Sequence, residues 1–167
     1  MSERVLIELL YGQGAHANTL GCVEDISLDV AGRLPDGFTH SIWQLVWHMN
    51  FWMAYDLKRI RDEKPAYPTH ASESWPADAA PPSEEEWRRT IAVFRDLLAE
   101  LATLAGSPPD VLSQEVGATH PDHTKRSASL LAVLWQAVAH NSYHIGQVVM
   151  MRSSLGAWPP KGGGDSW

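Results

Sequence analysis

Hydrophobic residues recur at helical spacing in four segments of this chain, and breaker-rich stretches separate them. The segments cover about residues 4–31, 41–62, 83–101 and 127–155. Within each segment apolar residues return every three or four positions, which is the period of a helix buried on one side. No stretch of any length alternates apolar and polar residues as a strand would. The pattern therefore predicts an all-α fold: a four-helix bundle with long loop connections.

Three of the predicted helices have clear end signals. Ser41 followed by Gln44 is typical of a capping box, in which each side chain accepts from a backbone N–H of the other. Ser83 precedes three glutamates, which suit the positive end of a helix dipole. Gly156 is well placed to end the last helix.

The first segment and the longest connection are harder to interpret. Gly12, Gly14 and Gly21 each cost a helix roughly 1 kcal/mol relative to alanine, but the apolar spacing still predicts a helix over 4–31. Five prolines lie in residues 63–82, which excludes regular structure there. A connection of that length is uncommon in a compact domain unless it covers another element or serves function.

Length and charge narrow the class of protein. A chain of 167 residues is one domain by size, so we expect a single bundle over residues 1–167. The net charge of −7 offers no basic stripe for phosphates, which argues against a nucleic-acid partner. No apolar run is long enough to cross a membrane, and the first residues do not resemble a secretory signal, so we expect a cytoplasmic protein. Cys22 is the only cysteine and is interpreted as a small buried hydrophobe.

Two histidines four residues apart, His140 and His144, interrupt the apolar face of the last segment. Positions four apart lie on the same side of a helix, so both imidazoles can reach one divalent metal. His48 lies in the middle of the second helix, where an imidazole is costly to bury without a partner. A bundle can bring all three rings together and leave a coordination position open. The alternative is three separately hydrogen-bonded core histidines, and we favour the metal site.

These same residues carry a family resemblance. The segments HSIWQLVWHMNFW and HNSYHIGQVVMMRSSLGAWPP resemble the second and fourth helices of the DinB/YfiT-like family. Members of that family are four-helix bundles in which one histidine of the second helix and two of the fourth hold a metal. The matching positions here are His48, His140 and His144. The resemblance extends over nearly the whole chain, and relatives include transferases that use low-molecular-weight thiols such as bacillithiol or mycothiol.

Other polar residues are weaker candidates. Tyr55 lies two turns after His48, on the same helix face, and is the candidate for a catalytic hydroxyl. Gln44 and Gln147 are candidates for fixing an imidazole tautomer. The remaining histidines are less favoured as ligands: His16, His40, His70, His120 and His123.

The leading hypothesis is an enzyme whose divalent metal, Zn or Ni first, activates a low-molecular-weight thiol for transfer to an electrophilic small molecule. Metal-dependent hydrolysis is the enzymatic alternative, but no carboxylate is evident on the faces that carry the histidines. A third hypothesis is a non-catalytic, metal-binding, stress-associated protein. We expect a homodimer, for which the tryptophan-rich second helix and the GAWPP tail offer a partner surface.

Overall fold

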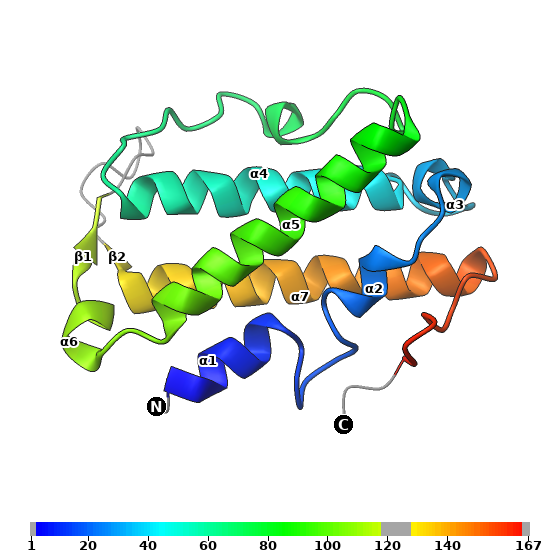
Figure 1. Cartoon of the computed structure of the whole chain (residues 1–167). Helices are drawn as coiled ribbons and strands as arrows, with labels where there is room; N and C mark the ends of the chain where they lie inside the picture. Colours follow the sequence, from blue (N-terminus) through cyan, green and yellow to red (C-terminus); the bar gives the residue numbers. More distant parts are fainter. Residues whose placement is uncertain (1–2, 118–127, 165–167) are drawn as a thin grey trace.

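The computed structural model describes residues 3–117 and 128–164, and three long helices dominate it. These are α4 (Ile42–Ile60), α5 (Glu84–Ala105) and α7 (Leu130–Ser154). In Figure 1, α4 and α7 run side by side in opposite directions, and α5 crosses them diagonally. Their buried apolar side chains form one continuous core. The predicted all-α class is confirmed.

The residues predicted to cap α4 and α5 do so in the structure. The Ser41 hydroxyl accepts from the Gln44 backbone N–H at 3.2 Å, and the Gln44 amide oxygen accepts from the Ser41 N–H at 2.9 Å. Ser83 caps α5 in the same way. The last helix begins slightly later than the apolar pattern indicated: its cap is Ser129.

The prediction of one helix over residues 4–31 is wrong. The structure has three short helices there, α1 (Glu3–Leu10), α2 (Gly21–Glu24) and α3 (Leu28–Gly32). Gly12 and Gly14 adopt φ angles of +80° and +70°, a left-handed conformation that ends α1 and that other residues adopt with strain. The eight-residue helix α1 packs against α5 and α7, so the described chain has three long helices and not the four that were predicted.

Four small elements complete the described chain. They are the 3₁₀ turn η1 (Ala71–Ser74), the helix α6 (Pro109–Leu112) and the strands β1 (Glu115–Val116) and β2 (Ala128–Ser129). The two strands pair antiparallel, a short ladder that the sequence pattern did not indicate. The strand β2 leads directly into α7, whereas η1 lies in the long connection that runs along α4 (Figure 1).

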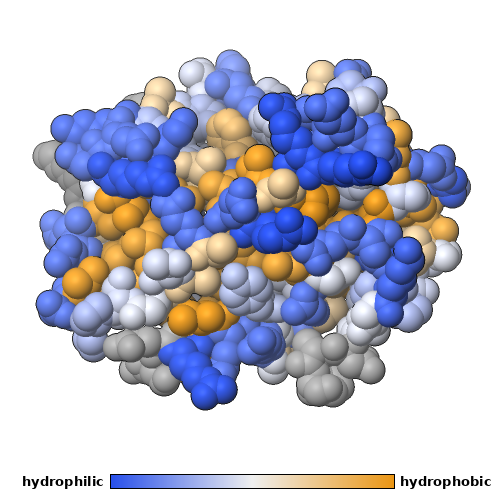
Figure 2. Space-filling model, viewed as in Figure 1, coloured by the Kyte–Doolittle hydropathy of each residue, from blue (hydrophilic) through white to orange (hydrophobic). Residues whose placement is uncertain are grey.

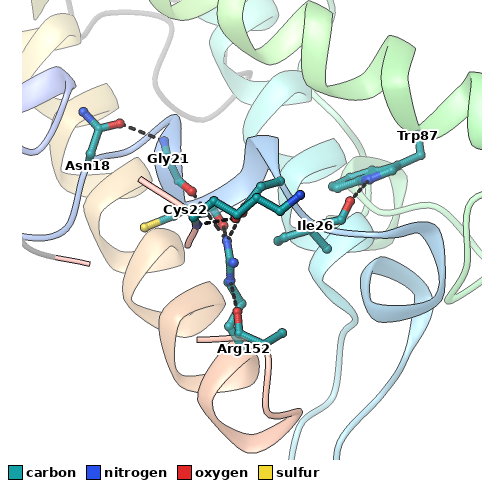
Figure 3. A network of polar contacts seen from close by, with 9 residues as sticks. Asn18, Gly21, Cys22, Ile26, Trp87 and Arg152 are labelled. Carbon is teal, nitrogen blue, oxygen red and sulfur yellow. Dashed lines mark hydrogen bonds and ion pairs between the residues drawn. The ribbon is translucent and has the colours of Figure 1, made fainter. Parts of the chain in front are cut away.

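A buried arginine ties the short N-terminal helices to α7. Arg152 is 2% exposed, and its Nη1 atom donates to the Cys22 carbonyl oxygen and to an Asp25 carboxylate oxygen, each at 2.8 Å. Nearby, the Trp87 indole of α5 donates to the Ile26 carbonyl oxygen at 2.8 Å. Figure 3 shows the Arg152 and Trp87 contacts together. The irregular N-terminal segment is thus held by polar contacts as well as by apolar packing.

Hydrophobic side chains are exposed across the middle of the face drawn in Figure 2. Hydrophobic residues show there as a band broken by hydrophilic side chains. Among the described helices, none combines the length and the hydropathy needed to cross a bilayer.

Candidate metal centre

Three imidazoles from two helices meet between α4 and α7. The Nε2 atom of His140 lies 3.2 Å from the Nε2 atom of His48 and 3.2 Å from that of His144. His48 and His144 are 7% and 6% exposed, and His140 is half-buried. The sequence predicted that these three side chains converge, and the structure brings them together.

Hydrogen bonds on the far side of two rings fix where their protons lie. The Nδ1 atom of His48 lies 3.0 Å from the Ser74 carbonyl oxygen, and that of His144 lies 2.7 Å from the Gln147 amide oxygen. An oxygen of either kind only accepts, so Nδ1 carries the proton in both rings. Each Nε2 atom therefore directs a lone pair toward the cluster.

That arrangement favours a cation at the centre. A single proton on the Nε2 atom of His140 can be donated to only one of His48 and His144, so the other contact is left without a hydrogen bond. A divalent metal removes the conflict, because it accepts all three lone pairs at once. Metal–imidazole bonds of about 2.0–2.1 Å in tetrahedral geometry place the nitrogens about 3.4 Å apart. The observed separations of 3.2 Å are close to that spacing.

The long connection after α4 covers one side of the cluster. The Trp75 indole stacks on His48 with ring centroids 3.8 Å apart and on His40 with centroids 3.9 Å apart. Two rings at such distances cannot share one face, so the indole lies between them. The Gln44 side chain donates to the Pro76 carbonyl oxygen at 3.0 Å and holds this part of the connection against α4.

Burial keeps the three rings neutral. Loss of solvent lowers the pKa of His48 to about 4 and the pKa of His140 to about 4, and it also lowers the pKa of His144. The mutual repulsion of the charged rings lowers the pKa values of His48 and His140 further. At neutral pH the nitrogens are therefore ligands rather than cations.

A cavity of about 370 Å³ adjoins the cluster at His140. Its size is that of a small-molecule site. The aromatic part of its wall is formed by Trp52, Tyr55 and Tyr67, which contact one another edge to face or tilted, with centroids 5.4–5.9 Å apart. Tyr55, the candidate catalytic hydroxyl, thus lines the same cavity as a histidine of the cluster. Burial raises the pKa of its phenol, which stays protonated at neutral pH.

Two charged residues of the same cavity were missed by the sequence reasoning. Asp56 and Arg59 both line it, and the Arg59 guanidinium donates to the Asp56 carboxylate at 3.0 Å. Asp56 lies about 80° around the helix from His48, which placed it off the expected line of the site. Burial raises the pKa of Asp56 to about 6, although Arg59 acts to lower it.

The match to known families agrees with this geometry. Residues 13–148 match the model of the DinB superfamily. The chain belongs to the DinB superfamily. No curated protein matches the chain significantly.

The other histidines that the structure describes in this DinB-superfamily chain do not join the cluster. His16 lies in the loop after α1, where its Nε2 atom is 2.9 Å from the Ser142 hydroxyl. His40 stacks on Trp75, and His70 begins the η1 turn. His120 and His123 lie outside the described residues. Gln147 contacts an imidazole as predicted, whereas the Gln44 side chain bonds to the backbone instead.

Proposed function

We propose that His48, His140 and His144 bind a divalent metal, Zn²⁺ or Ni²⁺, and that the protein transfers a low-molecular-weight thiol to an electrophilic small molecule. The observation that supports this most strongly is the convergence of three Nε2 atoms beside a cavity of small-molecule size, with the His140 atom 3.2 Å from each of the other two. Three neutral nitrogen ligands suit both metals and leave room for an exchangeable ligand.

The bound cation would supply the positive charge that keeps a thiol deprotonated at neutral pH. The protein's own residues orient the reactants. His48 and His144 are held in one tautomer by Ser74 and Gln147, and the aromatic wall excludes water from the electrophile. In the transfer itself the sulfur–carbon bond forms, the bond to the leaving group breaks with its electron pair, and the thiol proton passes to solvent. Tyr55 is the proposed donor of a hydrogen bond to the leaving group, which its protonated phenol and its position in the cavity wall support.

Metal-dependent hydrolysis is the second candidate, and Asp56 is the observation in its favour. A buried carboxyl with a pKa near 6 has the basicity of a general base. However, Asp56 lies eight residues after His48, about 12 Å along the helix axis. No carboxylate belongs to the histidine cluster within the described chain. Because Asp56 lies far from the cluster for a general base, we favour thiol transfer over hydrolysis.

The test is a conjugation assay with metal content measured in parallel. Zinc-loaded and chelator-treated protein is incubated with 1-chloro-2,4-dinitrobenzene and, in turn, cysteine, glutathione and bacillithiol. We expect one metal per chain and a thioether product with at least one thiol, with chloride released. Chelation and the His140→Ala substitution should abolish both the metal and the turnover.

His16→Ala is the matched control, because it removes a histidine that lies outside the cluster. It should retain metal and activity. Metal binding without conjugation to any thiol would contradict the transferase and favour the non-catalytic, metal-binding homodimer. Cleavage of a nitrophenyl ester without thiol would favour the hydrolase.

A further inference from the structure

The cavity beside His140 contains a buried ion pair that the proposed chemistry does not use. The side chains of Arg59 and Asp56 are only 12% and 10% exposed, and both line the cavity. The Arg59 guanidinium donates from Nη1 to Asp56 and from Nε to the Gly117 carbonyl oxygen at 3.3 Å. Within the part of the chain that the structure describes, its Nη2 amino group has no acceptor.

A buried ion pair of this kind adds little net stability to a helix. Removing both charges from water costs several kcal/mol, and apolar residues of the same size often serve stability equally well. Burial also pushes Asp56 toward its neutral form, since its pKa rises to about 6. At neutral pH Asp56 still carries most of its negative charge, and among the described residues it is the carboxylate bonded to Arg59. The remaining Nη2 group of Arg59 can donate to a second anion in the cavity.

The position of Arg59 indicates what shape of ligand fits the cavity. Along α4 the cavity wall passes from Trp52 through Tyr55 and Asp56 to Arg59, in successive turns away from His48. On α7 it passes from His140 to Gln136 in the same direction. One end of the cavity therefore faces the imidazole cluster and the other faces the guanidinium, with aromatic rings between them.

We propose that Arg59 binds the carboxylate of a small acidic reactant whose other end is directed toward the histidine cluster. A planar guanidinium matches a carboxylate in geometry and donates charge-assisted hydrogen bonds to it. That the ligand is a reactant depends on the proposed function; that the cavity selects a carboxylate does not. The acidic group can belong to the thiol or to the electrophile, and the two arms of the experiment distinguish these sources.

The first arm uses metal-free protein and a probe without sulfur. Binding of 3-phenylpropionate and of its neutral analogue 3-phenylpropanamide is measured by isothermal titration calorimetry. We expect the acid to bind about tenfold more tightly than the amide, as one charge-assisted hydrogen-bonding site implies. Equal affinities, or no binding of the acid, would overturn the proposal whether or not the protein is an enzyme.

Two variants with opposite expected effects on acid binding distinguish the loss of the guanidinium from misfolding of the protein. Arg59→Gln should remove the preference for the acid and leave amide binding unchanged. Asp56→Asn should increase affinity for the acid several-fold, because it removes the competing carboxylate without removing the guanidinium. Lys58→Gln is the control, because Lys58 is exposed on the same helix and does not line the cavity. An Arg59→Gln protein that still prefers the acid would contradict the assignment.

The second arm uses zinc-loaded protein and compares 3-mercaptopropionate with 3-mercaptopropionamide. If the thiol carries the acidic group, the acid binds more tightly than the amide and the difference disappears in Arg59→Gln. If the electrophile carries it, the two thiols bind equally and 3-phenylpropionate still binds. Failure of both thiols to bind zinc-loaded protein would count against the proposed function alone, because the first arm is read without metal.

Discussion

The Nδ1 atom of His48 and the carbonyl oxygen of Ser74 lie 3.0 Å apart, although 26 residues separate them in the chain. This contact directs the His48 Nε2 lone pair toward His140 and His144. It also explains why the long connection after α4 packs along that helix. Ser74 fixes the ring by a hydrogen bond, and its neighbour Trp75 covers the ring by stacking.

Gln147 plays the corresponding part for His144. Its amide oxygen lies 2.7 Å from the His144 Nδ1 atom. Replacing it by methionine keeps the size of the side chain and removes the acceptor, so we expect zinc affinity to fall about 10- to 100-fold. Competition with a chromophoric chelator measures this. Gln13→Met, at an exposed position, is the control. Unchanged affinity in Gln147→Met would show that the contact does not orient the ring.

The histidine cluster should make the metal-free protein sensitive to acid. Burial lowers the pKa values of His48 and His140 in the folded protein to about 4, from the ordinary histidine value of 6.5. The unfolded chain therefore binds protons more readily, and the stabilisation is fully present above pH 6.5 and lost as the pH falls toward 4. Urea unfolding at about pH 7 and about pH 5 measures the loss.

A His48→Leu/His140→Leu double variant isolates this effect. Its free energy of unfolding should depend less on pH over the same range, because it lacks the two buried imidazoles. An identical pH dependence in both proteins would mean that the rings are not held neutral in the folded state.

Asp56 should make the stability of the protein depend on pH in the opposite direction. Burial raises its pKa from 3.8 to about 6, so the folded protein holds this proton more tightly than the unfolded chain. The resulting contribution, about 2–3 kcal/mol, is fully present below pH 3.8 and lost as the pH rises through 6. The stability of the wild type relative to Asp56→Asn should therefore decrease between these values. Parallel pH profiles for the two proteins would contradict the raised pKa.

The buried ion pair of Arg152 with Asp25 should be important for stability. Arg152→Met leaves a partly buried carboxylate without its partner, and the Lys161 backbone N–H, which donates to Asp25 at 2.6 Å, compensates only in part. We expect a loss of about 2–4 kcal/mol in the free energy of urea unfolding. Arg88→Met removes an exposed pair with Glu84 and is expected to have little effect. Equal effects of the two substitutions would contradict the structural role of Arg152.

The sequence predicted the parts of the site that depend on helical periodicity. His48, His140 and His144 lie at positions whose facing follows from the helix repeat, and the Ser41 cap fixed where α4 begins. The single helix over 4–31 was wrong, because apolar spacing alone cannot show that Gly12 takes a left-handed conformation.

Site residues that lie in irregular segments of the chain could not be predicted in the same way. Ser74 and Trp75 lie in a proline-rich connection without any period, and their partners are fixed only by tertiary packing. Asp56 and Arg59 were missed for a different reason. The cavity is wider than the line of one helix face, so it reaches Asp56, about 80° around α4 from His48. It also extends about three turns along the helix to Arg59, which lies close to that line but far from His48.

If the three imidazoles share one cation, anomalous diffraction from crystals of zinc-loaded protein will locate it between them. Data collected on either side of the zinc absorption edge locate the metal without reference to any assumed ligand. We predict one strong peak at about 2.0–2.1 Å from the Nε2 atoms of His48, His140 and His144. A peak bound elsewhere, or the absence of any peak between the three rings, would contradict the account.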